Sequence, residues 1–313
     1  MKKTDTLYWK KEYIPIYSFN NMKYLRVLKN NNQISSETVK KAFYPEHISN
    51  FSMQMVFSGN SSYDIGKRHL NLYPDSFLAL NQGTQYSSKV DSNIPVNMLS
   101  ISFAPEFLND FYRTQHKNMK ALLDDPFHST EHTKGFFLET IYPFSGDMKY
   151  NILNLKNQLE QESPDDLLVN EYLHHSLINY FKIYHKEVSN KSENLSFLNK
   201  STKIEILKRL TFAKEYISSN YNKNIFLEDI AQTACLSVNH LLRTFKQAYG
   251  ISPHQYLIKV RIDRSKYLLT NTKYSLNEIV EIIGFECPSS FIRLFKTMNS
   301  ITPGKYRLNL QQN

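Results

Sequence analysis

Two arginines occupy the same position in a pattern that occurs twice near the C-terminal end of the chain. Arg243 lies in LLRTFK, and Arg293 lies in FIRLFK fifty residues further on. The same offset relates GISPHQY at residues 250–256 to SITPGKY at residues 300–306. Two matches in one register indicate an internal repeat. Because an exposed arginine can donate two hydrogen bonds to guanine, the repeated arginine points to recognition of DNA bases.

The residues around Arg243 predict how the first copy of the repeat positions this side chain. A short helix over Leu227–Ala234 is followed by a turn at residues 235–236. Ser237 then caps a second helix over Val238–Tyr249, in which Leu241 and Phe245 face inward. Two helices joined by a tight turn allow the second helix to enter the major groove of DNA.

The second copy of the repeat follows the same order of elements. A short helix over Leu276–Ile283 ends at Gly284, which can adopt the left-handed turn conformation. Pro288 suits the start of the next helix, where Phe291 and Phe295 pack inward. The chain is therefore expected to contain two helix-turn-helix units in tandem.

The polar residues of the repeat divide into two groups by their chemistry. Asn and Arg suit base edges, whereas Lys and the N-termini of helices suit phosphates. The predicted base-reading residues are Asn239, His240, Arg243, Ser289, Ser290 and Arg293. The predicted phosphate contacts are Lys246, Ser252, Lys296 and Thr302. For each residue, the alternative is an exposed polar side chain with no role in binding.

The segment between the two copies predicts a rigid spacer. Tyr256, Val260, Tyr267 and Leu268 recur at helical spacing, which favours one helix over residues 253–270. At 1.5 Å per residue this helix is roughly 27 Å long. Such a spacer could set two recognition helices in successive turns of the major groove, about 34 Å apart.

Charge supports a polyanionic partner for the same region. Residues 205–313 hold 15 Lys or Arg and 8 Asp or Glu, whereas the preceding residues hold 23 and 21. The alternative is a solvated basic surface. Two cysteines, no apolar leader and no run of 18 apolar residues favour a cytoplasmic protein without a membrane span.

The N-terminal half has a different pattern. Short apolar runs between residues 50 and 104, separated by turn signals, predict a β-sandwich or barrel, and Pro105 begins a helix. Further helices are expected over Asn151–Gln161 and after the capping pair at residues 163–164. The apolar face of the latter helix contains Leu173, Leu177, Phe181 and Tyr184.

At this point the sequence resembles the AraC/XylS family of bacterial transcriptional regulators. The resemblance covers about Ile225 to Arg307 and is most specific in IVEIIGFECPSSFIRLFKTMNSITPGKYR. It implies a DNA-binding domain with two recognition helices, sequence-specific control of transcription, usually activation, and contact with RNA polymerase. Cys235 and Ser300 stand where the family usually has glycine, which affects local turn geometry.

The resemblance also implies an N-terminal cupin-like barrel that binds a small effector and supports a homodimer. The expected fold is therefore α+β: a cupin-like domain at residues 1–148, a helical dimerisation region and linker at 149–202, and a DNA-binding domain at 203–313. The candidate effector-binding aromatics are Tyr73, Phe77, Tyr86 and Phe103. The alternative is that these residues are core, and that the helix bearing Leu173 packs on its own barrel instead of a second chain.

Two other classes of function remain open from the sequence. A metal-dependent cupin enzyme would need clustered histidines, but His128 and His132, like His174 and His175, favour surface or packing roles, so no metal, cofactor or catalysis is expected. A fused DNA-repair methyltransferase would need N-terminal cysteines, and both cysteines are C-terminal. An architectural DNA-binding protein would rely on charge and bending without base reading.

Overall fold

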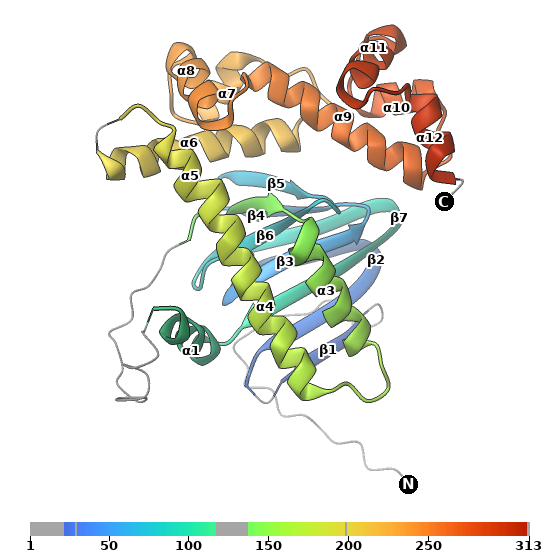
Figure 1. Cartoon of the computed structure of the whole chain (residues 1–313). Helices are drawn as coiled ribbons and strands as arrows, with labels where there is room; N and C mark the ends of the chain where they lie inside the picture. Colours follow the sequence, from blue (N-terminus) through green and yellow to red (C-terminus); the bar gives the residue numbers. More distant parts are fainter. Residues whose placement is uncertain (1–21, 29, 117–136, 198, 312–313) are drawn as a thin grey trace. The chain divides into compact units, whose positions relative to one another are not determined.

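The computed structural model describes residues 22–28, 30–116, 137–197 and 199–311. These residues form two compact units, Met1–His185 and Lys186–Asn313, each with its own internal contacts. We describe each unit by itself. The first unit combines an antiparallel sheet with helices, and the second is helical (Figure 1).

The sheet of the first unit follows the order β1-β2-β7-β3-β6-β8, and β4 joins it by pairing with β7 and β5. Every strand pairing within the sheet is antiparallel. The strands are β1 (Met22–Val27), β2 (Gln33–Ile48), β3 (Phe51–Ser58), β4 (Ser61–Ile65), β5 (Arg68–Leu72), β6 (Ser76–Leu80), β7 (Gln85–Phe103) and β8 (Thr140–Pro143).

Two long strands, β2 and β7, serve both halves of this sheet. The first half of β2 pairs with the second half of β7 up to Val39, and after a register shift the pairing continues from Lys41 to Ile48. β3 pairs with the second half of β7, whereas β4 pairs with its first half. Because the path ends at β1 and β8 among the described residues, the sheet is open, and the predicted closed barrel is not confirmed.

The two faces of the sheet have different cores, because successive side chains of a strand point to opposite faces. On β6, Phe77 belongs to a cluster shared with the helices, whereas Leu78 belongs to a second cluster on the opposite face. The helices of the unit are α1 (Pro105–His116), α3 (Gly146–Leu159) and α4 (Asp166–Tyr184). Figure 1 shows α3 and α4 lying across one face of the sheet.

The start of α4 differs from the sequence-based prediction. Asp165 caps the helix, since its Oδ1 accepts hydrogen bonds from the backbone N–H groups of Leu167 at 2.9 Å and Leu168 at 3.3 Å. The prediction of a cap at Ser163 with proline at the first helical position is therefore wrong. A carboxylate at residue 165 accepts both orphan N–H groups and is favoured beside the positive end of the helix dipole.

The second unit is built around two long helices. α6 (Lys200–Ser219) buries Leu210, Ala213 and Ile217, and α9 (Pro253–Asn271) runs between the two halves of the repeat. The other helices are the π-helical turn η2 (His185–Ser189), α5 (Asn190–Glu193), α7 (Leu227–Thr233), α8 (Val238–Tyr249), α10 (Leu276–Ile282), α11 (Pro288–Asn299) and α12 (Pro303–Gln311). The two predicted helix-turn-helix units correspond to α7–α8 and α10–α11.

The turns of the two helix-turn-helix units both contain a residue with positive φ, a glycine in one turn and a cysteine in the other. Gly284 has a φ of 76°, and a Cβ on it would lie 2.8 Å from backbone atoms of Asn222. Cys235 has a φ of 51° in the first turn, so an L-residue adopts there the left-handed conformation that favours glycine. Ser300, at the end of α11, adopts a φ of 63°. The turn geometry is thus retained at both positions where glycine was expected.

Candidate nucleic-acid interface and ligand pocket

The first recognition helix, α8, separates its side chains cleanly into two groups. Leu241, Phe245 and Ala248 are buried. Asn239 and Arg243 are exposed one helical turn apart, and Lys246 is exposed in the last turn. The predicted base readers Asn239 and Arg243 therefore share a solvent-facing side with a predicted phosphate contact.

His240 lies in a different environment from its neighbours on α8. Its ring packs against that of Phe197, with 6.0 Å between the ring centroids. Its Nε2 atom is shielded from solvent and has no hydrogen-bond partner. Among the residues predicted to read bases on α8, His240 is therefore less accessible than Asn239 and Arg243.

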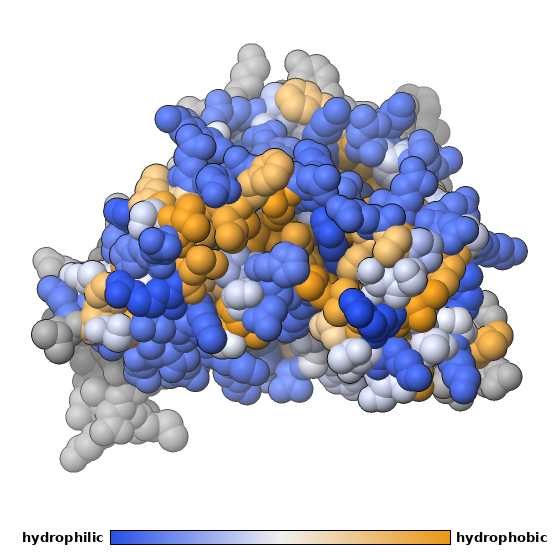
Figure 2. All heavy atoms as spheres, turned by 90° about the horizontal axis from the view of Figure 1, so that it is seen from above, coloured by the Kyte–Doolittle hydropathy of each residue, from blue (hydrophilic) through white to orange (hydrophobic). Residues whose placement is uncertain are grey.

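The second recognition helix, α11, repeats the arrangement with a more mixed surface. Phe291 and Phe295 are buried, whereas Arg293 and Lys296 are exposed. Met298 is also exposed, at 45% of its surface, so α11 is less uniformly polar than α8. Figure 2 shows hydrophobic side chains gathered in places among hydrophilic ones on one face of the structure.

The N-terminus of α11 holds a small polar cluster around Cys287. The Cys287 thiol lies 3.4 Å from the Ser289 hydroxyl and 3.1 Å from the Ser290 hydroxyl. Hydrogen bonding with these two serines lowers the pKa of Cys287 to about 7. Ser289 is exposed and Ser290 is half-buried, so Ser289 is the more accessible of the two predicted base readers.

The two predicted hydroxyl contacts to phosphate are helix-capping residues. Ser252 accepts a hydrogen bond from the backbone N–H of Gln255 at 3.2 Å, and Gln255 in turn accepts one from the Ser252 N–H. Thr302 accepts from the N–H of Lys305 at 3.4 Å. Each hydroxyl thus orders the start of α9 or α12, and its own proton is available as a donor to an anion.

A second pair of recurring arginines holds the repeat together. Arg261 donates from Nε to the carbonyl of Tyr221 at 2.7 Å and from its guanidinium to that of Lys223 at 3.0 Å. Arg307 donates to the carbonyls of Leu269 and Tyr274 at 3.3 and 2.6 Å. In both copies the arginine therefore ties down the chain that leads into the first helix of the helix-turn-helix unit.

The segment before α6 packs on α8. Lys191 pairs with Glu187 and lies 5.0 Å from the ring centroid of Tyr249. The side-chain amide of Gln247 donates to the Ser196 hydroxyl at 3.1 Å. Leu195, at 1% exposure, is buried in the same segment. Residues 187–197 are therefore part of the structure that supports the first recognition helix.

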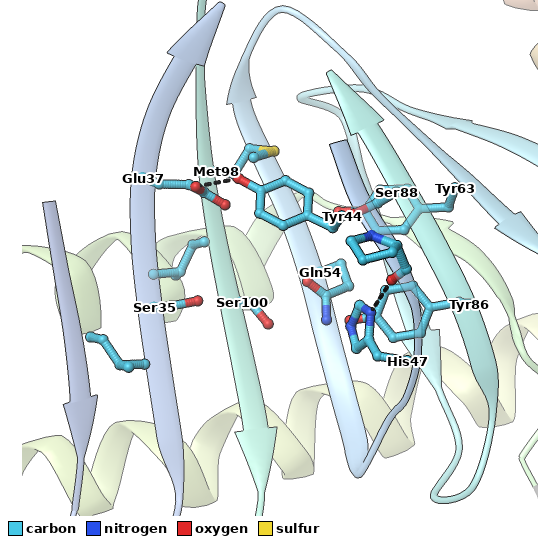
Figure 3. Close-up of a pocket in the computed structure, with 13 residues that line it drawn as sticks. Ser35, Glu37, Tyr44, His47, Gln54, Tyr63, Tyr86, Ser88, Met98 and Ser100 are labelled. Atoms are coloured by element: carbon cyan, nitrogen blue, oxygen red, sulfur yellow. Dashed lines mark hydrogen bonds between the residues drawn. The ribbon is translucent and has the colours of Figure 1, made fainter. Parts of the chain in front are cut away.

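The first unit contains a pocket on the sheet face opposite α3 and α4 (Figure 3). Two adjoining cavities, of about 120 and 150 Å³, share Ser35, His47, Gln54, Tyr86 and Ser100 among their lining residues. Each cavity is several times the roughly 10–15 Å³ that one water molecule needs. The space is therefore large enough for a small organic molecule.

Glu37 and Tyr44 form a hydrogen-bonded pair in the wall of this pocket, with the Tyr44 hydroxyl donating to the Glu37 carboxylate. Burial raises the pKa of Glu37, and the bond from Tyr44 opposes this shift. Burial and the carboxylate raise the pKa of Tyr44, so its hydroxyl stays protonated as a donor. Since the Pro45 carbonyl 2.9 Å away can only accept, Nδ1 of His47 carries a proton.

Of the four predicted effector-binding aromatics, only Tyr86 is among the residues that line the pocket. Phe77 and Phe103 are fully buried in the cluster beneath the helices, and the backbone of Tyr73 bonds to Ser76 in a turn. The polar lining residues were missed. The sequence does contain a sign of them: Ser35 and Glu37 are two residues apart on β2, so they point to the same face of the strand, and a buried strand face is usually apolar.

The histidines considered as metal ligands have other surroundings. The His174 ring packs 4.5 Å from that of Phe107, and burial lowers its pKa. His128 and His132 lie outside the described residues. Across the part of the chain that the structure describes, no cluster of three or more His, Cys, Asp or Glu could hold a metal ion. In the same residues, no helix is long and apolar enough to cross a membrane.

The C-terminal region is similar to known proteins. Residues 230–309 match a family model described as a helix-turn-helix domain. The chain is 33% identical over 138 residues to the Msm operon regulatory protein of Streptococcus mutans, covering 44% of this chain and 45% of that protein. It is 27% identical over 160 residues to the lactose operon transcription activator of Staphylococcus xylosus, covering 50% and 52%.

One solved structure is similar to the same region of the chain. It is a transcriptional regulator with an AraC-type DNA-binding domain from Chromobacterium violaceum. It is 28% identical, with a TM-score of 0.33, and the match covers 36% of this chain and 98% of that one. The chain spans about half the length of the curated relatives it matches. The C-terminal region of the chain therefore carries an AraC-type helix-turn-helix domain.

Proposed function

We propose that this protein is a sequence-specific DNA-binding regulator of transcription, acting as an activator. The observation that supports this most strongly is the repeated exposure of Arg243 on α8 and Arg293 on α11, each opposite a buried pair of apolar residues. An exposed arginine on a recognition helix suits guanine in the major groove. The two relatives are an operon regulatory protein and a transcription activator.

The proposed partners are double-stranded DNA, a second copy of the chain and RNA polymerase. Asn239, Ser289 and the two arginines would read bases, and Lys246 and Lys296 would contact phosphates. Because Leu173 and Leu177 are fully buried in the first unit's own core, a dimer would have to use other side chains. Sedimentation of the full chain tests pairing, with a monomer at high concentration as the opposing result.

We further propose that the boundary between the sensing and DNA-binding parts lies near residue 186, not at residue 203. Residues 187–197 contact Tyr249, Gln247 and His240 of α8. A fragment that begins at residue 203 lacks these contacts, so the linker predicted at the end of the 149–202 region would belong to the DNA-binding part.

The first unit is proposed as a cupin-like effector-binding part, with the pocket around Gln54 as the binding site. An effector changes DNA affinity only if it binds the DNA-competent and incompetent states unequally. We therefore expect an effector to alter DNA binding by the whole chain and not by the C-terminal unit alone.

The direct test of the proposed function is selection of bound DNA from a random pool by the purified full chain. Base reading predicts enrichment of a defined sequence, retained at raised salt. An architectural protein would give no enriched sequence and a steep loss of binding with salt. The absence of any enriched sequence would contradict the proposal.

A further inference from the structure

The face of the sheet that lines the pocket is polar where an interior face is normally apolar. Ser35, Ser100 and Gln54 stand side by side on β2, β7 and β3, because Ser100 pairs with both of the other two. In the next row, Ser102 pairs with Gln33 and Ser52.

Gln54 and Ser52 are both nearly inaccessible to solvent, at 6% and 2% exposure. Buried polar groups carry a desolvation cost unless they find hydrogen-bonding partners. Within the sheet, Gln54 donates to Ser52 at 3.3 Å and Ser52 shares a hydrogen bond with Ser49 at 2.7 Å. Two adjacent rows of polar groups facing a cavity still suit a polar ligand better than an apolar one.

The charged residues that line the pocket indicate which charge a ligand should carry. Glu37 is the one carboxylate among the described residues that line the two cavities, and none of these lining residues is Lys or Arg. One hydrogen bond from Tyr44 satisfies only part of its capacity to accept. The carboxylate therefore stands beside the cavity with no counter-charge in the lining.

Three tyrosines line the same pocket, and one of them, Tyr44, is hydrogen-bonded to Glu37. Tyr44, Tyr63 and Tyr86 all line the cavity, and the rings of Tyr63 and Tyr86 are stacked with 6.1 Å between centroids. The ring of His47 lies 4.2 Å from that of Tyr86. Aromatic faces attract cations through their quadrupole, and this attraction strengthens where water is excluded.

We infer that the pocket takes a small organic cation, a hydroxyl-bearing amine, whose ammonium group pairs with Glu37 in this tyrosine-lined pocket. The hydroxyl groups of such a ligand would meet the serine and glutamine rows on β2, β7 and β3. An anionic ligand would face the carboxylate without a compensating cation. A neutral polyol could form hydrogen bonds with the serine and glutamine side chains, but it would leave the Glu37 carboxylate without a positive partner. The inference rests on the proposed effector-binding role of this unit.

The test measures binding to the full chain in the absence of DNA, by calorimetry and by the shift of the melting temperature. Two sets of probes share a hydroxyl-bearing skeleton and differ in one group, which is cationic, neutral or anionic: ethanolamine, ethylene glycol and glycolate, and glucosamine, glucose and glucuronate. In at least one set, we expect the amine to bind at least about tenfold more tightly than its neutral and anionic counterparts, as one charge-assisted hydrogen bond implies.

The variant Glu37→Gln keeps an oxygen that can accept from Tyr44 and removes the charge, so it should lose most of this preference for the amine. The matched control is Asp91→Asn, which removes an exposed carboxylate that pairs with Lys41 and Lys89 outside the pocket lining. This control should leave amine binding unchanged. Circular dichroism of both variants checks that they are folded.

Three outcomes would overturn the inference: no melting shift with either amine, equal or tighter binding of the neutral or anionic probe in both sets, or undiminished amine binding by a folded Glu37→Gln variant. Because no DNA is present, each of these outcomes is separate from a failure of the proposed role in transcription. Enrichment of a DNA sequence by the same preparation would leave that role intact.

Discussion

The arginines of the repeat have two different roles: some form hydrogen bonds that stabilise the fold, and others are exposed and could contact DNA. Arg243 and Arg293 are exposed, whereas Arg261 and Arg307 each donate to two backbone carbonyls. Both pairs recur in the sequence, and their spacing alone does not separate these roles. The partners of Arg261 lie about forty residues away along the chain, so only the folded structure reveals its role.

A prediction at the same scale concerns Glu37, because ionisation of its buried carboxyl group should lower the free energy of unfolding. Burial raises its pKa above 4.5 in the folded chain, so just above that pH the folded state retains a proton that the unfolded state has released. The free energy of unfolding therefore falls as pH rises through this interval. We expect Glu37→Gln to gain stability relative to the wild type as pH rises above 4.5. Thermal melts of both proteins across this range measure it, and a constant difference would contradict the assignment.

Gly284 provides a second prediction at the residue scale. Its φ of 76° and the 2.8 Å approach of the Asn222 backbone leave no room for a Cβ. Gly284→Ala should lower the free energy of unfolding by about 1–3 kcal/mol. The control is Gly304→Ala, where nothing lies within 4 Å of the added Cβ. Urea denaturation compares the two, and equal effects would show that the close approach is unimportant.

At the scale of elements, the helices of the C-terminal unit were predicted closely and the strands only in part. Capping residues and 3.6-residue periodicity located α8 at Val238–Tyr249, as observed. β1 and β2 were missed because β2 alternates polar residues on its pocket face. The pocket itself could not be predicted, since it depends on pairings such as Gln54 with Ser100 between strands far apart in sequence.

The segment before α6 yields a prediction about this element. A fragment of residues 186–313 should be more stable than a fragment of residues 203–313, because only the longer one keeps Leu195 buried and the contacts of Lys191 and Ser196 with α8. Burial of one leucine side chain alone contributes about 1.5–3 kcal/mol. Urea denaturation followed by circular dichroism measures the difference. Equal stabilities would place the boundary at residue 203.

At the scale of the whole molecule, the two units differ in their chemistry. The C-terminal unit carries most of the excess positive charge, and the N-terminal unit carries a pocket with a single carboxylate. The helix α9 between the two copies of the repeat has 19 residues and is therefore about 28 Å long. This is shorter than the roughly 34 Å between successive major-groove turns.

The measurement that tests the central claim most directly is the affinity of the full chain and its arginine variants for the selected DNA sequence and its mutated forms. Arg243→Ala and Arg293→Ala should each cost about 1–3 kcal/mol of binding and relax base preference at a different part of the site. Lys208→Ala, an exposed charge on α6, is the control and should preserve the preference. If the double arginine variant binds the selected sequence with unchanged affinity and preference, the model of two base-reading helices is contradicted.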